Sequence, residues 1–213
     1  MSRTLAAWLV LAAAATTTGA PGGPREVVQA AVTRVLALLE EAQLQRPEVE
    51  PGSRLATIDQ ARAEIRRLAA ELFDFPEVAR RTLGRHWAGR TPAEQREFVG
   101  LFTELLERAY LGRIEQYAGE RILYTGEAVE GRFALVRSRI VTRRRTEMAL
   151  DYRLHRVDGR WKVYDVLIDG VSFVSTYRSE FNRILQSSSW DDLMDRLRKR
   201  RLEIRPVATR TAG

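Results

Sequence analysis

The segment YDVLIDGVSFVSTYRSEF, Tyr164–Phe181, changes its hydrophobic period part-way along. It begins like a strand, passes a turn signal at Asp169-Gly170, and takes up helical spacing from about Val171. The helical spacing is carried by Val174, Tyr177, Phe181 and Leu185. A strand therefore leads into a helix here, and the elements on either side of this junction decide the fold.

The residues from Arg121 to Ile168, up to the junction, are rich in Val, Ile, Leu and Tyr and predict strands. Asp158-Gly159 is a strong hairpin signal and Glu130-Gly131 is a weaker one. The expected strands are Arg121 to Val129, Arg132 to Arg143, Thr146 to Val157 and Arg160 to Ile168. Because their connections are short, we expect an antiparallel meander.

Helical spacing dominates the rest of the chain. The box Thr91-Pro92-Ala93-Glu94 is a specific helix start, and Ser189 can cap a last helix. The remaining expected helices are Pro24 to Gln45, one that carries Leu55 to Leu72, and a short one from Pro76 to Leu83. The helix that starts at Thr91 should end near Tyr117 or Gly119.

Helices first, one antiparallel sheet next and helices last predict the α+β class. We expect a strongly twisted four-stranded sheet with helices packed over its concave face, enclosing an apolar cavity. Residues 24–202 should form a single lipid-binding domain, and residues 203–213 a flexible tail.

Residues 1–20 have the pattern of an export signal. Arg3 supplies the positive end, Leu5 to Ala15 are apolar, and small residues follow, with cleavage expected between residues 15 and 23. An uncleaved anchor is the weaker alternative because the apolar run is shorter than a membrane span. We therefore expect a soluble protein outside the cytoplasmic membrane.

The chain is basic, with a formal net charge of +7 and no cysteine. In an exported protein this charge favours anionic lipid head groups or acidic partners over nucleic acid. Of the 35 basic residues only Lys162 and Lys199 are lysines, a bias that genome composition can explain. The run RLRKRR, Arg196 to Arg201, is either a solvated helix end or a contact for anionic head groups.

No pattern of residues indicates catalysis, a cofactor or a metal site. His86 and His155 are too far apart for metal-ligand spacing and are expected in surface or interface roles. Asp165 and Asp169 could form a carboxylate pair, but a turn explains them more simply. Asp151 and Tyr152 could act in a cone-shaped enzyme pocket, yet neighbours on a strand point to opposite faces.

Two blocks of sequence resemble the phospholipid-binding family typified by MlaC, also described as toluene-tolerance auxiliary proteins. In Phe73 to Ile122 the matching residues are Leu83, Gly84, Trp87, Gln95, Phe98, Phe102, Leu105, Leu106 and Tyr110. In the segment quoted first they are Tyr164, Asp165, Val166, Gly170, Val171, Ser172, Tyr177, Arg178 and Phe181. The resemblance covers about Arg25 to Leu197.

The resemblance implies a periplasmic, non-enzymatic and monomeric carrier of phospholipid that serves an ABC transporter in outer-membrane lipid asymmetry. Its implied partners are an inner-membrane complex with MCE domains and an outer-membrane complex of the lipoprotein type, with transient membrane-surface contact and no nucleic acid. A hopanoid or other polycyclic ligand is an alternative, because some relatives occur with hopanoid biosynthesis. An isomerase-like or hydratase-like enzyme is the alternative from another class, and an adaptor subunit with a collapsed core and no ligand is a third possibility.

A carrier of this kind needs a deep apolar cavity for acyl chains. Tyr164, Val166 and Ile168 are expected on one strand face that Val171 continues around the turn. The full set of expected lining residues is Phe102, Leu105, Leu106, Tyr110, Val136, Ile140, Leu150, Tyr152, Tyr164, Val166, Ile168, Val171, Phe173, Val174 and Tyr177. Arg178 is expected to bond to Asp165 or Asp169, or else to reach a phosphate.

Overall fold

The computed structural model describes residues 22–44, 51–114, 119–142, 145–200 and 202, with backbone alone for 42–44, 51–58 and 113. The expected export signal at residues 1–20, most of its expected cleavage range and the expected tail at 203–213 lie outside these residues.

The described chain is α+β, as predicted, with an open antiparallel sheet in the order β1-β2-β3-β4-β5. The strands are β1 Arg121–Glu130, β2 Phe133–Val141, β3 Glu147–Val157, β4 Arg160–Ile168 and β5 Val171–Ser172. The helices are α1 Pro24–Leu44, α2 Pro51–Leu72, α3 Phe75–Leu83, α4 Pro92–Ile114, α5 Phe173–Ser187 and α6 Trp190–Arg198, with a 3-10 turn at Gly84–His86.

The short strand β5 was missed by the prediction of four strands. Asp169 and Gly170 both have positive φ values, 47° and 79°, so they form a tight two-residue turn. The turn folds Val171 back onto Ile168 and Ser172 onto Leu167 before the helix begins at Phe173. A stretch of two residues is too short to give an alternating pattern, which is why the sequence predicted helix from Val171.

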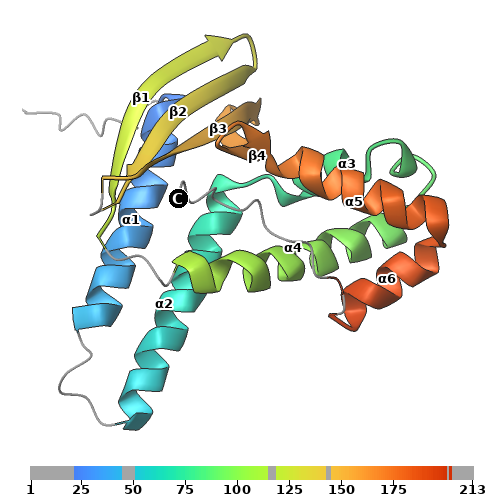
Figure 1. Cartoon of the computed structure of the whole chain (residues 1–213), viewed down its shortest axis with the longest axis horizontal. Coiled ribbons are helices and arrows are strands. Elements are labelled where there is room, and N and C mark those ends of the chain that lie inside the picture. Colours follow the sequence, from blue (N-terminus) through green and yellow to red (C-terminus); the bar gives the residue numbers. More distant parts are fainter. Residues whose placement is uncertain (1–21, 45–50, 115–118, 143–144, 201, 203–213) are drawn as a thin grey trace, which may run out of the picture.

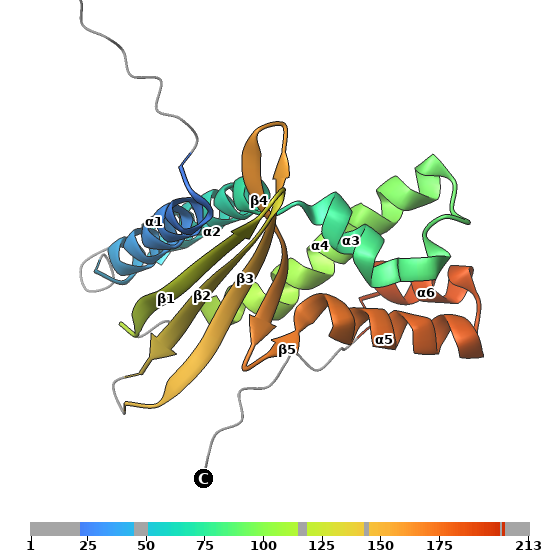
Figure 2. The same cartoon turned by 90° about the horizontal axis from the view of Figure 1, so that it is seen from above.

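The sheet curves over the first two helices, as Figure 1 shows. Helix α1 contacts β1 and β2, and α2 contacts β4, so both helices cover the concave face. Seen from above, the strands fan out in order and β5 leads directly into α5 (Figure 2). Helices α3, α4, α5 and α6 pack together beyond this end of the sheet. The expected placement of helices on the concave face is therefore confirmed.

The junction between β4 and α5 is held by the carboxylate of Asp165, which is 3% exposed. It accepts hydrogen bonds from Ser172 Oγ at 2.7 Å and Val174 N at 3.0 Å. It also accepts one from Arg153 Nη1 at 3.1 Å. Since Ser172 in turn caps α5 through the amide of Ser175, one buried charge fixes the strand, the turn and the start of the helix.

We expect Asp165→Ala to lower the free energy of unfolding by about 3 kcal/mol, because it removes three hydrogen bonds from one buried carboxylate. Urea unfolding measures the change. Asp191→Ala is the matched control, since Asp191 is an exposed aspartate in the first turn of α6 and should cost less than about 1 kcal/mol. Similar losses for the two variants would contradict the role given to Asp165.

Candidate functional site

The buried apolar residues of the described chain form two separate clusters. The sheet cluster lies between the concave face and helices α1 and α2, and the helical cluster joins α3, α4, α5 and α6. The sheet cluster consists of Val28, Leu72, Ala134, Val136, Tyr152, Leu154, Trp161 and Val163. The described residues thus form two packed cores, and the apolar residues at the edges of these cores are the candidates for binding a ligand.

The helical cluster is built on aromatic rings. Phe102 lies edge-on to Tyr177 and Phe181, with ring centroids 5.2 and 5.4 Å apart, and Phe98 stacks on Phe102 at 5.6 Å. Such edge-to-face contacts add to the stability that burial gives. Five of the expected lining residues are buried in this cluster, namely Phe102, Leu105, Leu106, Val174 and Tyr177.

A row of half-buried apolar side chains lies on the concave face at the end of the sheet nearest β5. Register places Ile122 beside Ile140 and Ile140 beside Met148, and it places Leu150 beside Ile168. We call this row the open strip; it consists of Ile122, Ile140, Met148, Leu150, Val166 and Ile168. Its residues lie on the same face of the sheet as the sheet cluster, but they are less deeply buried than the residues of that cluster.

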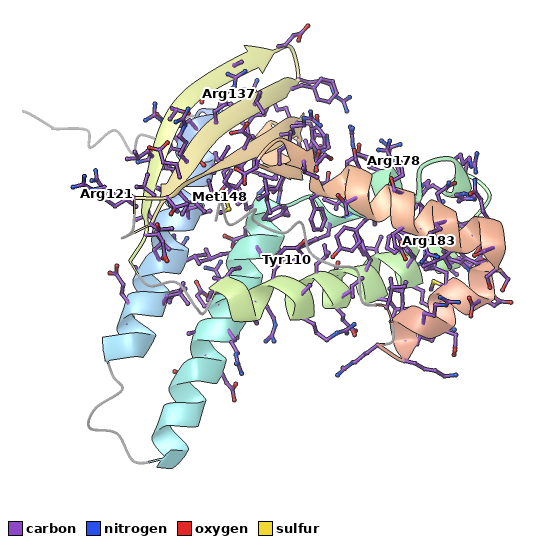
Figure 3. All side chains as sticks on the ribbon, viewed as in Figure 1. Tyr110, Arg121, Arg137, Met148, Arg178 and Arg183 are labelled. Carbon is purple, nitrogen blue, oxygen red and sulfur yellow. The ribbon has the colours of Figure 1, made fainter. Side chains whose placement is uncertain are left out.

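The open strip continues around the turn and onto the helices. Val171 pairs with Ile168 and is 50% exposed, and Phe173 follows at the start of α5. Phe173 contacts Tyr110 of α4, with ring centroids 5.5 Å apart. Figure 3 shows Met148 under the sheet and Tyr110 on α4, toward the same central region. At the end of α4, Ile114 is 37% exposed. Incompletely buried apolar side chains from the sheet and the helices therefore lie at the edges of the two cores, toward the same central region.

The expected lining residues fall into three groups. Ile140, Leu150, Val166 and Ile168 lie in the open strip, and Tyr110, Phe173 and Val171 extend it. Val136 and Tyr152 are buried in the sheet cluster, as five others are in the helical cluster. Sequence reasoning missed Ile122, Met148 and Ile114, although the pairing of Ile122 and Met148 with Ile140 could have indicated the first two.

The expectation that Tyr164 shares a face with Val166 and Ile168 is wrong. The register of β3 and β4 shifts between Arg153 and Leu154, so Tyr164 is an extra residue in the ladder. A bulge of this kind reverses the alternation of faces. The ring of Tyr164 contacts His155 and Phe133 on the convex side and lies 4.0 Å under the guanidinium of Arg81.

Three hydroxyl-bearing residues lie on the same face of the sheet as the open strip. Tyr124 and Ser138 are paired across β1 and β2, and Tyr152 lies one pair further along the same face. Burial raises the pKa of Tyr124 to about 12, and it raises the pKa of Tyr152 well above its ordinary value. Both phenols therefore stay protonated at neutral pH and can donate hydrogen bonds. The strip itself carries only hydrocarbon and thioether side chains, which offer no acid or base.

The groups considered for catalysis have structural roles. Asp169 accepts the amide of Ala149, and Asp165 holds the start of α5. The surface or interface role expected for His155 is corrected, since His155 is 4% exposed and its Nε2 lies 2.9 Å from Asp74, which caps α3. His86 lies 3.2 Å from the side-chain oxygen of Asn182. Within the described residues, no three His, Cys, Asp or Glu side chains gather as a metal site would require.

The model of the MlaC protein family matches residues 30–199, which is most of the chain. The chain belongs to the MlaC family. The resemblance drawn from the two sequence blocks is thereby confirmed, and so is the expectation of a non-enzymatic protein, because the family is one of lipid-binding transport proteins.

Two relatives of known character are similar to this MlaC-family chain. The intermembrane phospholipid transport system binding protein MlaC of Haemophilus influenzae is 30% identical over 125 residues, which is 56% of this chain and 58% of that protein. The phospholipid-binding protein of Ralstonia solanacearum, solved in complex with a phospholipid, superposes with a TM-score of 0.69 at 25% identity. That match covers 84% of this chain and 97% of the solved one.

Gly84 and Arg178, both in the sequence blocks that resembled the family, lie close to each other. Arg178 Nε donates to the carbonyl of Arg81 at 2.9 Å, and its side chain passes 3.6 Å from where a Cβ of Gly84 would lie. The expected bond of Arg178 to Asp165 or Asp169 is therefore wrong. Because Gly84 has a φ of 53°, a glycine is suited to end α3 there and lets Arg178 reach the last turn.

The basic run of this MlaC-family chain is largely neutralised within the described residues. Arg196 pairs with Asp192 at 2.8 Å, Arg198 with Glu97 at 2.7 Å and Lys199 with Asp195 at 2.9 Å. Arg201 lies outside the described residues. These contacts favour a solvated helix end over a dedicated site for anionic head groups. The described helices include none with the length and apolar character to cross a membrane.

Substitution by alanine should cost less unfolding free energy in the open strip than in the packed core. We expect Leu154→Ala to cost about 3 kcal/mol of unfolding free energy, because Leu154 is fully buried. Ile168→Ala should cost less than about 1.5 kcal/mol in protein free of ligand, because the side chain is only half-buried. Urea unfolding of delipidated protein compares the two, and equal costs would show that the strip is ordinary core.

Proposed function

We propose that this protein is an exported carrier that binds the acyl chains of a phospholipid and moves it between inner-membrane and outer-membrane complexes of an ABC-transporter system. The observation that carries the proposal is the open strip, a half-buried apolar surface, in a chain whose fold matches that of the Ralstonia solanacearum protein solved with bound phospholipid. The matched relative of Haemophilus influenzae is named for intermembrane phospholipid transport.

The energetics of the cargo require an apolar site of this kind. Two acyl chains hold about thirty methylenes, and at about 0.8 kcal/mol each their exposure to water would cost ~24 kcal/mol. Surface ion pairs, worth up to about 1 kcal/mol each, cannot offset that cost. We propose that the half-exposed residues of the strip, with Tyr110, Val171 and Phe173, line a cavity, and that the buried residues behind them support its walls.

Three other functions were open from the sequence. An adaptor subunit with a collapsed core would carry no lipid, and the extraction experiment below tests that alternative. A hopanoid would use the same apolar surface, so it stays as the second candidate ligand. An enzyme of the isomerase or hydratase kind needs an ionisable group at its reacting centre. The open strip provides none, and the family is not enzymatic. This second class of function is therefore not proposed.

The proposal includes location and partners. We place the protein in the periplasm as a monomer that meets an inner-membrane complex with MCE domains and an outer-membrane complex of the lipoprotein type. Family membership and the name of the matched relative support this placement. The basic character of the chain supports transient contact with anionic membrane surfaces.

Protein purified without detergent should carry lipid. We expect solvent extraction and mass spectrometry to find phospholipid, whereas the alternatives predict hopanoid, a small metabolite or nothing. Because bound lipid stabilises the folded state alone, delipidation should lower the melting temperature and added lipid should restore it. No co-purified lipid and an unchanged melting temperature would overturn the proposal.

A charge placed in the open strip should block binding. We expect Leu150→Glu to reduce co-purified lipid at least tenfold, since a carboxylate among acyl chains would be desolvated without a partner. Leu123→Glu is the matched control, because Leu123 lies on the convex face and is 39% exposed. Lipid per protein, measured by mass spectrometry, should stay at the wild-type value in the control. Circular dichroism confirms that both variants fold.

A further inference from the structure

The hydroxyl of Tyr124 is buried without a hydrogen-bond partner in the described structure. His155 and Arg90 also have one nitrogen without a partner, but each uses another nitrogen to contact a carboxylate. The phenol has a single oxygen, so its polar group is left entirely without a bond. A buried donor without a bond destabilises the protein. The hydroxyl of Tyr124 therefore needs an acceptor from outside the described chain.

Tyr124 lies at the border between the sheet cluster and the open strip. Its ring packs against the sheet cluster, and its β1 neighbour on the same face, Ile122, belongs to the strip. Across the sheet, Ser138 is already bonded, since its Oγ donates to the carbonyl of Leu150. The hydroxyl of Tyr124 therefore has an unused hydrogen-bond donor, and it lies next to the surface proposed for acyl chains.

The charges around Tyr124 decide which acceptor fits. The guanidinium of Arg25 lies 5.8 Å from the centre of the ring, and Glu127 accepts the backbone amide of Arg25 at 2.7 Å. A carboxylate therefore lies beside the backbone of Arg25, and a phosphate brought to the ring of Tyr124 would approach that negative charge as well as the guanidinium. Burial, which raises the pKa of Tyr124, also keeps the phenol a neutral donor. A neutral carbonyl oxygen suits this site better than an anion.

We propose that Tyr124 donates a hydrogen bond to an ester carbonyl of the bound lipid and thereby selects ester-linked acyl chains. The inference rests on the proposed function and adds to it a specificity-determining residue. An ester carbonyl is the neutral acceptor that every diacyl phospholipid carries at the junction of its head and tails. A polycyclic hydrocarbon has no such acceptor and would leave the phenol without a bond.

The test is competition between dipalmitoyl phosphatidylglycerol and its dihexadecyl ether analogue, which lacks both carbonyls. Delipidated wild-type protein is offered equal amounts, and mass spectrometry gives the ratio bound. We expect wild type to prefer the ester by roughly fivefold, the effect of one neutral hydrogen bond. Tyr124→Phe should bind both lipids equally. Tyr164→Phe, whose hydroxyl is on the convex side, should keep the wild-type preference.

Thermal unfolding gives a second readout that a merely structural hydroxyl would not produce. Delipidated Tyr124→Phe should melt at or above the wild-type temperature, because an unsatisfied group is removed. Loaded with the diester lipid it should melt below wild type. Equal ester preference in wild type and Tyr124→Phe would overturn the inference and leave a bound water as the partner. Failure of wild type to take up either lipid would instead count against the proposed function.

Discussion

The carboxylate of Asp165 joins the two halves of the molecule, and the candidate site depends on that connection. One oxygen holds the amide of Val174 in α5, and the other holds Ser172 and Arg153. Val174 belongs to the helical cluster and Arg153 to the sheet. Together with the contact of His155 with Asp74 at the start of α3, this carboxylate therefore fixes how the two cores are placed. Hydrophobic attraction alone would favour a merger of the two cores. The directional hydrogen bonds of a buried carboxylate oppose that merger.

The separation of the cores explains why the open strip stays half-covered. Sheet residues such as Leu154 and Val163 are buried in the cluster covered by α1 and α2, whereas Leu150, at the edge of that cluster, and Ile168 are only half-buried. The strip spans several strands, and contiguous apolar surfaces of this kind mark binding sites on proteins. A hydrocarbon chain can cover it reversibly, which a side chain fixed in the core cannot do.

Periodicity in the sequence was enough to predict the class, the strand order and most helix positions. It could not predict details set by single residues in three dimensions. The extra residue Tyr164 in β4 reverses the alternation of faces, and β5 is too short to show a period. Arg178 bonds a backbone carbonyl beside Gly84 although carboxylates stand closer in the sequence. Most sheet residues of the candidate site were named from the sequence. Which of them are buried and which are half-buried depends on how far α1 and α2 cover the sheet, and periodicity does not give that.

Exchange between two apolar sites explains why polar contacts matter to a carrier whose cargo is mostly hydrocarbon. When an acyl chain passes from one apolar site to another, the gain of about 0.8 kcal/mol per methylene appears on both sides and nearly cancels. What differs between donor and acceptor is then the small number of hydrogen bonds each makes to the lipid. A single phenol such as Tyr124 is weak beside the hydrophobic effect, yet it acts on that difference. The open strip would therefore determine whether lipid is carried. The hydroxyl of Tyr124 at its border would determine which lipid is kept.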